Sequence, residues 1–553
     1  MKNPVIAFLA LLLISVAGHA QAPVRRLPSN INHPSLHLFS PYISADGNAL
    51  LFVSNIGQDG ALTVSYTTKN LADWSEPKEL PKHINTRLNY LRGFALSADG
   101  KKLYLTCAKS PVIGGYDIFT SELNGTTWSP MENLMLPVNS KQNDGAPSLT
   151  PDGNNIYFMR CDKMDQHEAG GCKIFRASRK NGQWQEPVEL PEHINTGNSQ
   201  APRIMADGET LIFSSDKFPG NKGGMDLYQT RFQEGKWTDP IALTFVNTDK
   251  DDQFVTADAL GRYLIKEARG TRNNYELTEF LFPTQLRPQG LTKVEGKITD
   301  PNDLPVPAYI AVTDIETGKR VYSSRPLTDG SYFFYLKEGK RYEFSVNPEQ
   351  SNTTFFARIF DLTNERIPQK EKVNITLKNP SPGDELNLDM VKFKPNSAEL
   401  EPFSTEELKR LARLIKANPS LKFEIQVLLK GYRESTDLSD PTLTEIREEL
   451  KTIPVVRDTT IFEDSLSHPV DTTLVQTDST SGVSDSTDTT QVESFETVKV
   501  IYYHNDRTPE QAQAIVDYLI EAGAPGSNLS TFVNAIPGES EEDYTLTIKT
   551  AIR

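Results

Sequence analysis

The chain has 553 residues, which is room for about three or four domains of ordinary size. It carries 58 basic and 73 acidic side chains, and the resulting net charge of −15 argues against nucleic acid as a partner, because phosphate backbones select basic surfaces. Three cysteines without a Cys-x-x-Cys pair exclude a disulfide-scaffold fold, and no cluster of residues indicates a metal ion or a cofactor.

The first twenty residues have the pattern of a secretory signal peptide. A single lysine precedes an apolar run over residues 4–16, and small residues surround the expected cleavage after Ala20. We therefore expect a signal peptide at 1–20 and a mature chain outside the cytosol, without a transmembrane segment. An oxidising compartment permits a disulfide between Cys161 and Cys172, with Cys107 left free; the alternative is three buried small hydrophobic side chains.

Residues 21–285 contain an internal repeat. Five turns, four of them ending in Asp-Gly and one weaker, recur with their glycines 53, 53, 55 and 53 residues apart, and a short apolar strand follows the turn. The tryptophans keep nearly the same period, at Trp74, Trp128, Trp184 and Trp237. A period of this length with several short strands per unit is typical of a propeller blade. We expect a five-bladed β-propeller, with six blades as the alternative.

The repeat resembles the TolB-like propeller family, whose marks are a Ser-Pro-Asp-Gly turn and a Gly-Gly-x-Asp-Ile-Tyr strand. Residues 150–153 and 114–119 carry close versions of these patterns. We interpret the aspartates as turn residues, because Asp bonds its own backbone, rather than as metal ligands or catalytic groups. We interpret the tryptophans as packing between blades rather than as platforms for carbohydrate.

Residues 291–380 change to a period-two alternation that predicts a small antiparallel β-sandwich. The expected strands lie at 294–298, 309–312, 320–322 and 330–334. The pattern around Gly296, Pro305 and Gly330 resembles the carboxypeptidase regulatory-like domain. That resemblance implies a role in spacing or adhesion and no catalytic centre.

Residues 385–553 alternate strands with two amphipathic helices. We expect helices at 404–418 and 509–522, and strands at 388–393, 423–429, 530–533 and 544–552. Capping boxes that begin at Ser404 and Thr508 open the helices. This βαβαββ order, with marks such as Phe393-x-x-x-Ser397-Ala398 and Asn418-Pro419, resembles the OmpA-like peptidoglycan-associated domain. The expected fold class is therefore multidomain and mainly β, with an α+β domain at the C-terminus.

The OmpA-like resemblance implies a ligand site that this chain does not reproduce. In the family, an Asp after the second strand and an Arg in the second helix hold the diaminopimelate of peptidoglycan. Those positions fall here on Lys430 and Gln511. A displaced pair, Asp506 and Arg507, is the candidate peptidoglycan-binding site; the alternative is that Asp506 favours the helix dipole and Arg507 is solvated.

A long insertion at 431–497 interrupts this domain. Residues 471–490 are dominated by Ser, Thr and Asp, and aromatic residues are nearly absent, so we expect the insertion to be a disordered loop. Residues 423–429 and 498–503 flank it, and we expect them to pair as the two arms of a β-hairpin.

The sequence contains no HExxH motif, no GxSxG elbow and no phosphate-binding loop, so we expect no enzyme. The order of domains resembles Bacteroidetes-type envelope proteins, which implies the periplasm, association with the outer membrane and envelope proteins as partners. We expect a non-catalytic scaffold whose propeller docks proteins and whose peptidoglycan site is degenerate. Two alternatives stay open: a true peptidoglycan-binding anchor of an outer-membrane or type IX secretion-like assembly, and a periplasmic glycan-binding sensor or hydrolase.

Overall fold

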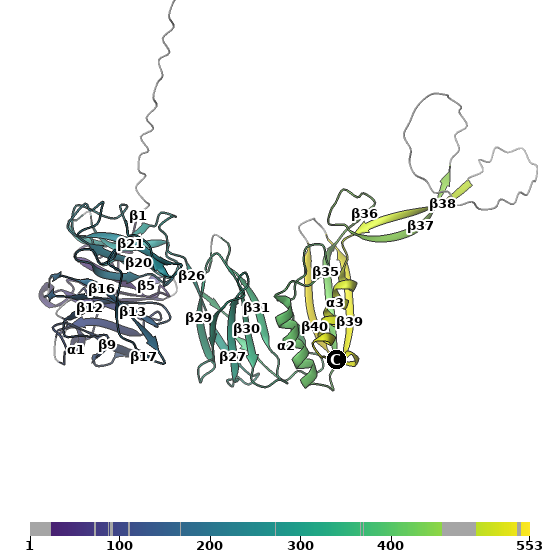
Figure 1. Cartoon of the computed structure of the whole chain (residues 1–553), viewed down its shortest axis with the longest axis horizontal. Helices are drawn as coiled ribbons and strands as arrows, with labels where there is room; N and C mark the ends of the chain where they lie inside the picture. The colour runs from purple at the N-terminus through teal and green to yellow at the C-terminus, as the bar shows by residue number, and fades with distance from the viewer. Residues whose placement is uncertain are drawn as a thin grey trace, which may run out of the picture. The chain divides into compact units, whose positions relative to one another are not determined.

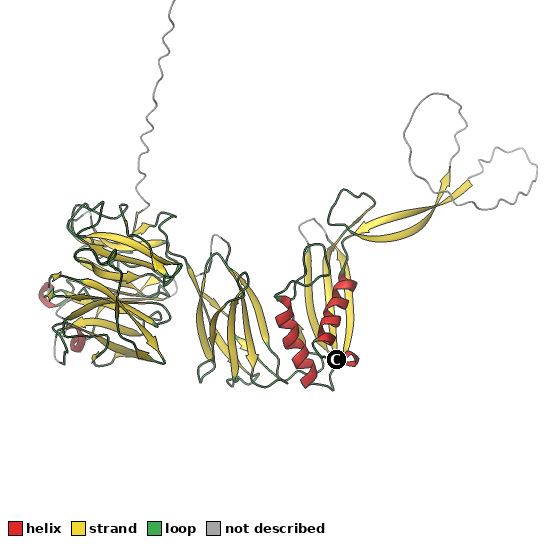
Figure 2. Cartoon of the chain, viewed as in Figure 1, coloured by secondary structure: helices red, strands yellow, loops and turns green. Residues whose placement is uncertain are grey.

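The structure is a computed structural model that describes residues 24–455 and 494–553, with gaps at 71–72, 87, 89–91, 109–110, 166, 271, 365–366, 369 and 539–543. The expected signal peptide lies outside the described residues. The chain divides into two compact units, Met1–Asn347 with Ile359–Leu377 and Pro348–Arg358 with Lys378–Arg553. Both are rich in strands, which are yellow in Figure 2. In the part of the chain that is described, no helix is long and apolar enough to cross a membrane.

Four sheets of the first unit share one antiparallel order, in which three long strands are followed by two short ones that both pair with the third. The first sheet holds β2 (Leu38–Ile43), β3 (Ala49–Ser54), β4 (Thr63–Asn70), β5 (Asp73–Trp74) and β6 (Lys78–Glu79). The second holds β7 (Phe94–Leu96), β8 (Lys102–Cys107), β9 (Asp117–Asn124), β10 (Thr127–Trp128) and β11 (Glu132–Asn133). The third holds β12 (Asn143–Leu149), β13 (Asn155–Cys161), β16 (Lys173–Lys180), β17 (Gln183–Trp184) and β18 (Val188–Glu189). The fourth holds β19 (Gln200–Ile204), β20 (Thr210–Ser215), β21 (Asp226–Gln233), β22 (Lys236–Trp237) and β23 (Ile241–Ala242).

A fifth sheet joins the two ends of this region. It contains β24 (Tyr263–Arg269), β25 (Tyr275–Leu281) and β1 (Val24–Arg26), so the first strand of the region completes the last sheet. Thr256 forms an isolated bridge to Ile265 on the inner side of β24 and also accepts a hydrogen bond from Ile43 N of the first sheet, 3.0 Å away. The small elements of the region are η1 (Gln58–Gly60), α1 (Lys82–Asn85), β14 (Lys163–Met164) and β15 (Ala169–Gly170).

Hydrogen bonds between neighbouring sheets close the ring within the described residues. Asp46 N donates to Ala98 O, Ala146 N to Thr106 Oγ1, Ile204 N to Ser148 Oγ, and Arg203 Nε to Val255 O. Together with the contact between Ile43 and Thr256, these bonds link each sheet to the next around the ring. A closed ring of antiparallel sheets in sequence order is the topology of a β-propeller, and its strands are the purple to teal part of Figure 1.

The Asp-Gly turns connect the first and second strands of the sheets. Gly47, Gly100, Gly153 and Gly208 all have φ near +70°, between 68° and 71°, a region that glycine enters without strain. In the first turn, Asp46 Oδ1 accepts hydrogen bonds from Ser44 Oγ and from Asn48 N. The aspartates therefore act as turn residues, as the sequence predicts.

The tryptophans contribute to the packing between sheets. Trp128 of the second sheet meets Tyr66 of the first edge to face at 6.2 Å, and Trp237 of the fourth meets Tyr157 of the third at 6.1 Å. Trp74 lies in a buried cluster with Leu277 of the fifth sheet. These contacts agree with the expected packing role and leave three of the four rings buried.

Cys161 and Cys172 form a disulfide with their Cα atoms 4.0 Å apart. Cys161 ends β13 and Cys172 directly precedes β16, so the bond closes the segment that contains the small hairpin of β14 and β15. Cys107 is a buried thiol.

After the ring, two sheets form the expected sandwich. One contains β26 (Leu291–Thr299), β29 (Ser331–Lys337), β32 (Lys370–Lys372) and β33 (Ile375–Thr376); the other contains β27 (Ala308–Asp314), β28 (Arg320–Ser324), β30 (Arg341–Pro348) and β31 (Phe356–Asp361). Aromatic side chains fill the space between the sheets, with the Phe344 ring 5.7 Å from Tyr332 and 5.0 Å from Phe334. The pairing of β26 with β32 and β33 is parallel, an arrangement that period-two alternation does not reveal.

The second unit is built on one four-stranded sheet in the order β34-β40-β35-β39. Its elements are β34 (Glu385–Asn387), α2 (Ser404–Ala417), β35 (Phe423–Tyr432), α3 (Thr508–Glu521), η2 (Gly526–Asn528), β39 (Leu529–Pro537) and β40 (Thr545–Ile552). Alternate residues of β35, such as Phe423, Ile425 and Val427, share one core with the apolar stripes of both helices. The helices, red in Figure 2, therefore cover the same face of the sheet.

The start of this unit differs from the expectation. The strand predicted at 388–393 lies earlier, at β34, because the amides of Met390 and Lys392 bond to side chains of α2. The acceptors are Glu407 Oε2 and Ser404 Oγ, at 2.8 and 2.9 Å. A capping box requires Ser404 and Glu407 to bond to backbone amides at the start of α2. Their side chains bond instead to the amides of Lys392 and Met390, so the capping box predicted at Ser404 is wrong.

The insertion also differs from the expectation. It contains β36 (Glu434–Ser435) and a long hairpin of β37 (Glu445–Val455) and β38 (Ser494–His504), so the prediction of disorder over 431–497 is wrong at both ends. Residues 456–493, with the whole of the Ser, Thr and Asp tract, lie outside the described residues. The predicted pairing of 423–429 with 498–503 is wrong as well, because β38 pairs with β37 and β36 while β35 pairs with β39 and β40.

Candidate functional site

Lys430 and Gln511, which stand at the two ligand-binding positions of the OmpA-like resemblance, do not form a charged pair. Lys430 is exposed near the end of β35, where it lies opposite Ile536 and Thr545 of the neighbouring strands. Gln511 is buried in the first turn of α3, and its Nε2 donates to Ser397 O at 3.1 Å. Because Gln511 faces this carbonyl, the capping box predicted with Thr508 is also wrong.

Asp506 is committed to the start of α3. Its Oδ1 accepts hydrogen bonds from Thr508 N at 3.0 Å and from Thr508 Oγ1 at 2.7 Å. The carboxylate thus satisfies a backbone donor that the first helical turn leaves unpaired, and its charge complements the helix dipole. This is the alternative role that the sequence allowed for Asp506.

Arg507 is buried, in contrast to the solvated side chain that the sequence allowed. Its side chain is 5% exposed and its Nε lies 3.2 Å from Glu445 Oε1. Its Nη2 donates to Thr442 O at 2.9 Å and also bonds to Thr444 Oγ1. All three of these partners belong to the insertion, so the guanidinium faces oxygen atoms of the chain itself, although its Nε makes no hydrogen bond within the described residues.

Asn505 completes the junction between the insertion and α3. Its Oδ1 accepts from Arg433 N and its Nδ2 donates to Gly431 O, both at 2.9 Å. Consecutive side chains at 505, 506 and 507 thus fasten the end of β35, the helix start and the base of the hairpin. The displaced pair of the sequence analysis lies at this junction, with Asp506 and Arg507 directed to different internal partners.

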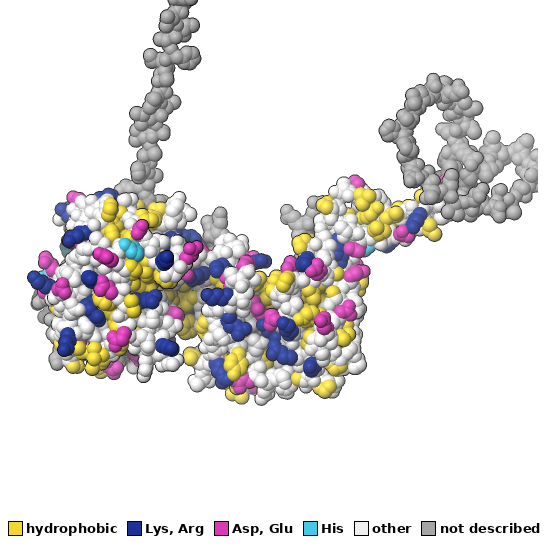
Figure 3. All heavy atoms as spheres, viewed as in Figure 1, with side chains coloured by type: hydrophobic (Ala, Val, Ile, Leu, Met, Phe, Trp, Pro, Cys, Tyr) yellow, Lys and Arg dark blue, Asp and Glu magenta, His cyan; other side chains and the backbone are white. Residues whose placement is uncertain are grey.

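Beyond the junction, the hairpin of β37 and β38 exposes apolar side chains. Leu450 is 72% exposed and Phe495 is 64% exposed. The register places Ile446, Leu450, Ile501 and Phe495 on one face, because residues paired across an antiparallel ladder share a face and alternate along each strand. Figure 1 shows the hairpin extending away from β35 and β39, and hydrophobic atoms gather on it in Figure 3. Within the described residues, β37 is an edge strand of its sheet, and the short β36 is the other.

In the ring, sequence reasoning missed a recurrent asparagine. Five asparagines, each preceded by Ile or Val, occur 53, 54, 56 and 52 residues apart. Each side chain accepts from the amide and donates to the carbonyl of one residue, at 2.8–3.2 Å; this residue lies on the third strand of the sheet in four cases and on β25 in the fifth sheet. The pairs are Asn32 with Leu277, Asn85 with Val64, Asn139 with Ile118, Asn195 with Ile174 and Asn247 with Leu227. The even spacing was the signal that could have revealed them.

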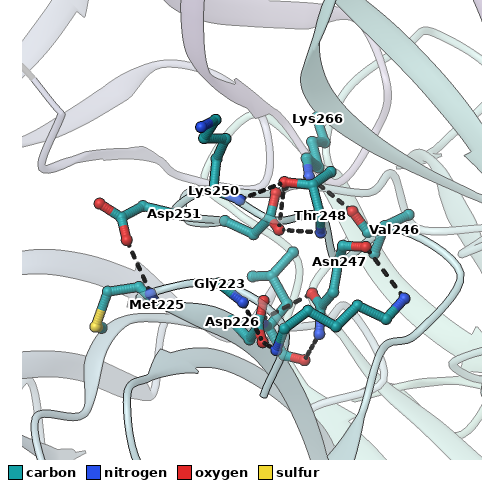
Figure 4. A network of polar contacts seen from close by, with 12 residues as sticks. Gly223, Met225, Asp226, Val246, Asn247, Thr248, Lys250, Asp251 and Lys266 are labelled. Atoms are coloured by element: carbon teal, nitrogen blue, oxygen red, sulfur yellow. Dashed lines mark hydrogen bonds and ion pairs between the residues drawn. The ribbon is translucent and has the colours of Figure 1, made fainter. Parts of the chain in front are cut away.

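A buried polar network lies beside one of these asparagines, as Figure 4 shows. Lys266 Nζ bonds to the carboxylate of Asp252 and donates to Val246 O at 2.8 Å. The other carboxylate oxygen of Asp252 accepts from the amide and the hydroxyl of Thr248, at 2.5 and 3.1 Å. Asp226 holds a turn nearby by accepting from Lys222 N and Gly223 N.

The third sheet repeats this network with other residues. Arg160 Nε donates to Asp144 Oδ1 at 2.6 Å, and Ser140 N donates to Asp144 Oδ2 at 2.7 Å. Burial raises the pKa of Asp144, while the Arg160 charge opposes that rise. Asp144 and Asp252 each bond to a cationic side chain and to a loop amide, so the two networks connect a loop to β13 and to β24.

One further carboxylate lies near the inner strands of the ring. Glu267 Oε2 accepts from Ser40 N at 3.1 Å, and burial raises the pKa of Glu267 while Arg92 lowers it. In the described part of the chain, no group of three or more His, Cys, Asp or Glu side chains is placed to hold a metal ion.

No protein-family model and no curated protein matches the chain. Solved structures that resemble it include a protein described as TolB from Agrobacterium tumefaciens, 13% identical, covering 57% of this chain and 96% of that one with a TM-score of 0.28. An oligogalacturonate lyase from Vibrio parahaemolyticus is 9% identical, with coverage of 49% and 96% and a TM-score of 0.30. An arabinanase from Bacillus subtilis is 14% identical, with coverage of 44% and 94% and a TM-score of 0.30. Similarity at this level carries no argument about activity.

Proposed function

We propose that this protein is a non-catalytic scaffold of a bacterial cell envelope, located in the periplasm in association with the outer membrane. In this proposal the five sheets of the ring are the blades of a TolB-like propeller that docks proteins. The sandwich is a regulatory-like spacer, and the second unit is an OmpA-like module that has lost its peptidoglycan site. The hairpin of β37 and β38 is an additional element for docking an envelope protein.

The observation that carries the docking role is a group of exposed apolar side chains on one face of the hairpin, where they alternate with the ion pair of Lys499 and Glu448. A two-stranded hairpin is marginally stable in water unless its apolar side chains pack against another layer. The face defined by Ile446, Leu450, Ile501 and Phe495 has exposed members on both strands, and the unpaired edge of β37 is suited to strand addition. A partner that covered this face would bury both the side chains and the edge.

The loss of peptidoglycan binding is supported by the contacts that Asp506 and Arg507 make within the chain. A diaminopimelate ligand needs a carboxylate for its ammonium group and a guanidinium for its carboxylate. Here the Asp506 carboxylate accepts hydrogen bonds from Thr508, and the Arg507 guanidinium forms an ion pair with Glu445. A ligand would have to displace contacts that already exist within the chain.

The same reasoning favours a scaffold over a glycan hydrolase. Glycoside hydrolysis uses two carboxyl groups that flank one bond. In the described residues, Asp144 and Asp252 are ion-paired, and Glu267 is bonded to a backbone amide. A hydrolase assay of the purified chain on envelope glycans tests this part of the proposal, and turnover would contradict it.

The docking role is tested by crosslinking in cells with a photoreactive residue at Tyr503, followed by identification of the attached protein. We expect one discrete envelope protein, and we expect the double variant Leu450→Asp with Phe495→Ser to lower its yield by at least about tenfold, because central apolar contacts dominate interface energies. Leu438→Asp is the matched control, since Leu438 is 70% exposed but lies outside the two strands. Equal yields from the double variant and the wild type would contradict the docking role.

A further inference from the structure

Arg203 places a charged group among the inner strands of the ring. It lies on β19 and is 9% exposed, and its Nε donates at 2.8 Å to the carbonyl of Val255, in the segment before β24. Its guanidinium carbon lies 3.7 Å from the centre of the Tyr42 ring on β2 of the first sheet. One side chain thus contacts the first strand of another sheet and the segment that leads to the fifth sheet, which places it among the inner strands of the ring.

The charge of Arg203 is not balanced by a carboxylate. Among the described residues no carboxylate forms an ion pair with it, and its buried Nη1 has no hydrogen-bond partner. Burial lowers the pKa of Arg203 to about 10, against a small rise from Tyr42. An unpaired buried charge is costly, and an anion beside it would offset part of that cost.

A small cavity lies beside this guanidinium. Its volume is about 10 Å³, which is about what one water-sized species needs. The lining comes from the inner strands or adjoining turns of four sheets and is mostly apolar, with two arginines: Arg92, Phe94, Ala146, Pro147, Ala201, Pro202, Arg203, Phe254 and Val255. The cavity therefore combines positive charge with a wall that offers no carboxylate.

The backbone around the cavity is held in an unusual conformation. Ala146, Ala201 and Phe254 all have positive φ, between 46° and 49°, although none is glycine. Ser40 has the same conformation, with φ 49°, at a bulge of β2 that matches those of β12 and β19. Its buried hydroxyl also lacks a partner in the described structure. Strain of this kind, repeated at matching places in the ring, is frequent at binding sites.

We propose that the axial cavity binds a monovalent inorganic anion of the halide class, with chloride as the physiological ion, held by the guanidinium of Arg203. A monatomic anion suits a cavity of this size better than a carboxylate-bearing metabolite or phosphate, which are larger. Arg92 lies at the same cavity with its guanidinium carbon 5.9 Å from the centre of the Phe254 ring, and its charge also acts on the buried carboxyl of Glu267. The ion neutralises the buried charge and links the inner strands at the axis.

The direct test is a crystal of the full mature chain soaked in sodium bromide. We expect an anomalous peak within hydrogen-bond distance of Arg203 Nη1. Absence of that peak overturns the proposal, whatever the effect of salt in solution, because the cavity would then hold water or nothing.

A solution experiment tests whether the ion stabilises the ring. Tryptophan fluorescence reports on the ring selectively, because all four tryptophans lie between residues 74 and 237. We expect the Tm of the wild type to be about 2–4 °C higher in sodium chloride than in sodium gluconate of equal ionic strength, since a ligand that binds the native state raises its stability. Arg203→Gln should lose this difference and the exposed-site control Arg272→Gln should keep it. If Arg203→Gln does not fold, the bromide soak of the wild type remains decisive.

Discussion

An asparagine side chain can take the place of a neighbouring strand, because its amide carries a donor and an acceptor in the same plane, as a peptide group does. The five recurrent asparagines use this property against the third strand of each sheet of the ring. The fifth of these contacts joins Asn32 to Leu277, residues from opposite ends of the region. Single side chains thus hold each sheet to the loop that precedes the next one, and one of them also helps close the ring.

Asn139→Leu tests this role. The substitution keeps a similar size but leaves the amide and the carbonyl of Ile118 buried without their partner, so we expect a loss of about 2–4 kcal/mol in the free energy of unfolding. Urea unfolding followed by tryptophan fluorescence measures it. Asn124→Leu is the control, because Asn124 is exposed at the end of β9, the strand that contains Ile118, and this substitution should change the midpoint little. Equal midpoints for the two variants would show that the hydrogen bonds of Asn139 contribute little.

The glycine turns and the asparagines differ in how much of their role is visible in a sequence. The role of Gly47 and its equivalents can be predicted from the sequence, because a tight turn requires a positive φ at the residue after Asp, and this requirement is local. Asn139 contacts a residue 21 positions earlier and Asn32 one that is 245 positions later. The regular spacing was present, but the partner strand of an asparagine cannot be predicted from the residues beside it.

At the scale of elements, the helices were predictable and the strand pairing was not. The helix expected at 404–418 is α2, Ser404–Ala417, because an apolar stripe with a period of 3.6 is a local property. The pairing of β38 depended on a strand, β37, that the charged sequence of residues 445–451 did not suggest. An exposed ladder tolerates charges on both faces, so composition predicted disorder where the chain forms a hairpin.

The attachment of the hairpin depends on Arg507. We expect Arg507→Met to leave the Glu445 carboxylate and the Thr442 carbonyl without their partner and to raise amide hydrogen exchange in β37 by about tenfold or more, because the buried guanidinium joins α3 to the base of the hairpin through these contacts. Exchange in β35 should change little, since its pairing with β39 and β40 does not involve Arg507. Arg413→Met on α2 is the control for loss of a positive charge. Unchanged exchange in β37 would mean that the strand ladder alone holds the hairpin.

For the whole molecule, the decisive question is whether any part of the chain holds the cell wall. The ring, the sandwich and the second unit were each expected from local patterns. The compact units divide the chain in two instead: Met1–Asn347 with Ile359–Leu377, which holds the ring and most of the sandwich, and Pro348–Arg358 with Lys378–Arg553. Ligand binding could not be predicted in the same way. It depends on whether Asp506 and Arg507 face a ligand or the insertion, which is a matter of tertiary contacts.

Binding to purified sacculi that contain diaminopimelate answers this question. We expect the full mature chain to stay in the supernatant, because the Asp506 carboxylate is hydrogen-bonded to Thr508 and the Arg507 guanidinium is ion-paired with Glu445. A net charge of −15 disfavours non-specific adsorption to an acidic polymer, so retention would report a specific site. An OmpA-like protein with the intact Asp and Arg pair is the positive control. Retention of the wild type that disappears in Asp506→Ala would contradict the proposed loss of the site, and it would favour the alternative of a true wall anchor. Retention that survives Asp506→Ala and Glu445→Gln would place wall binding elsewhere in the chain.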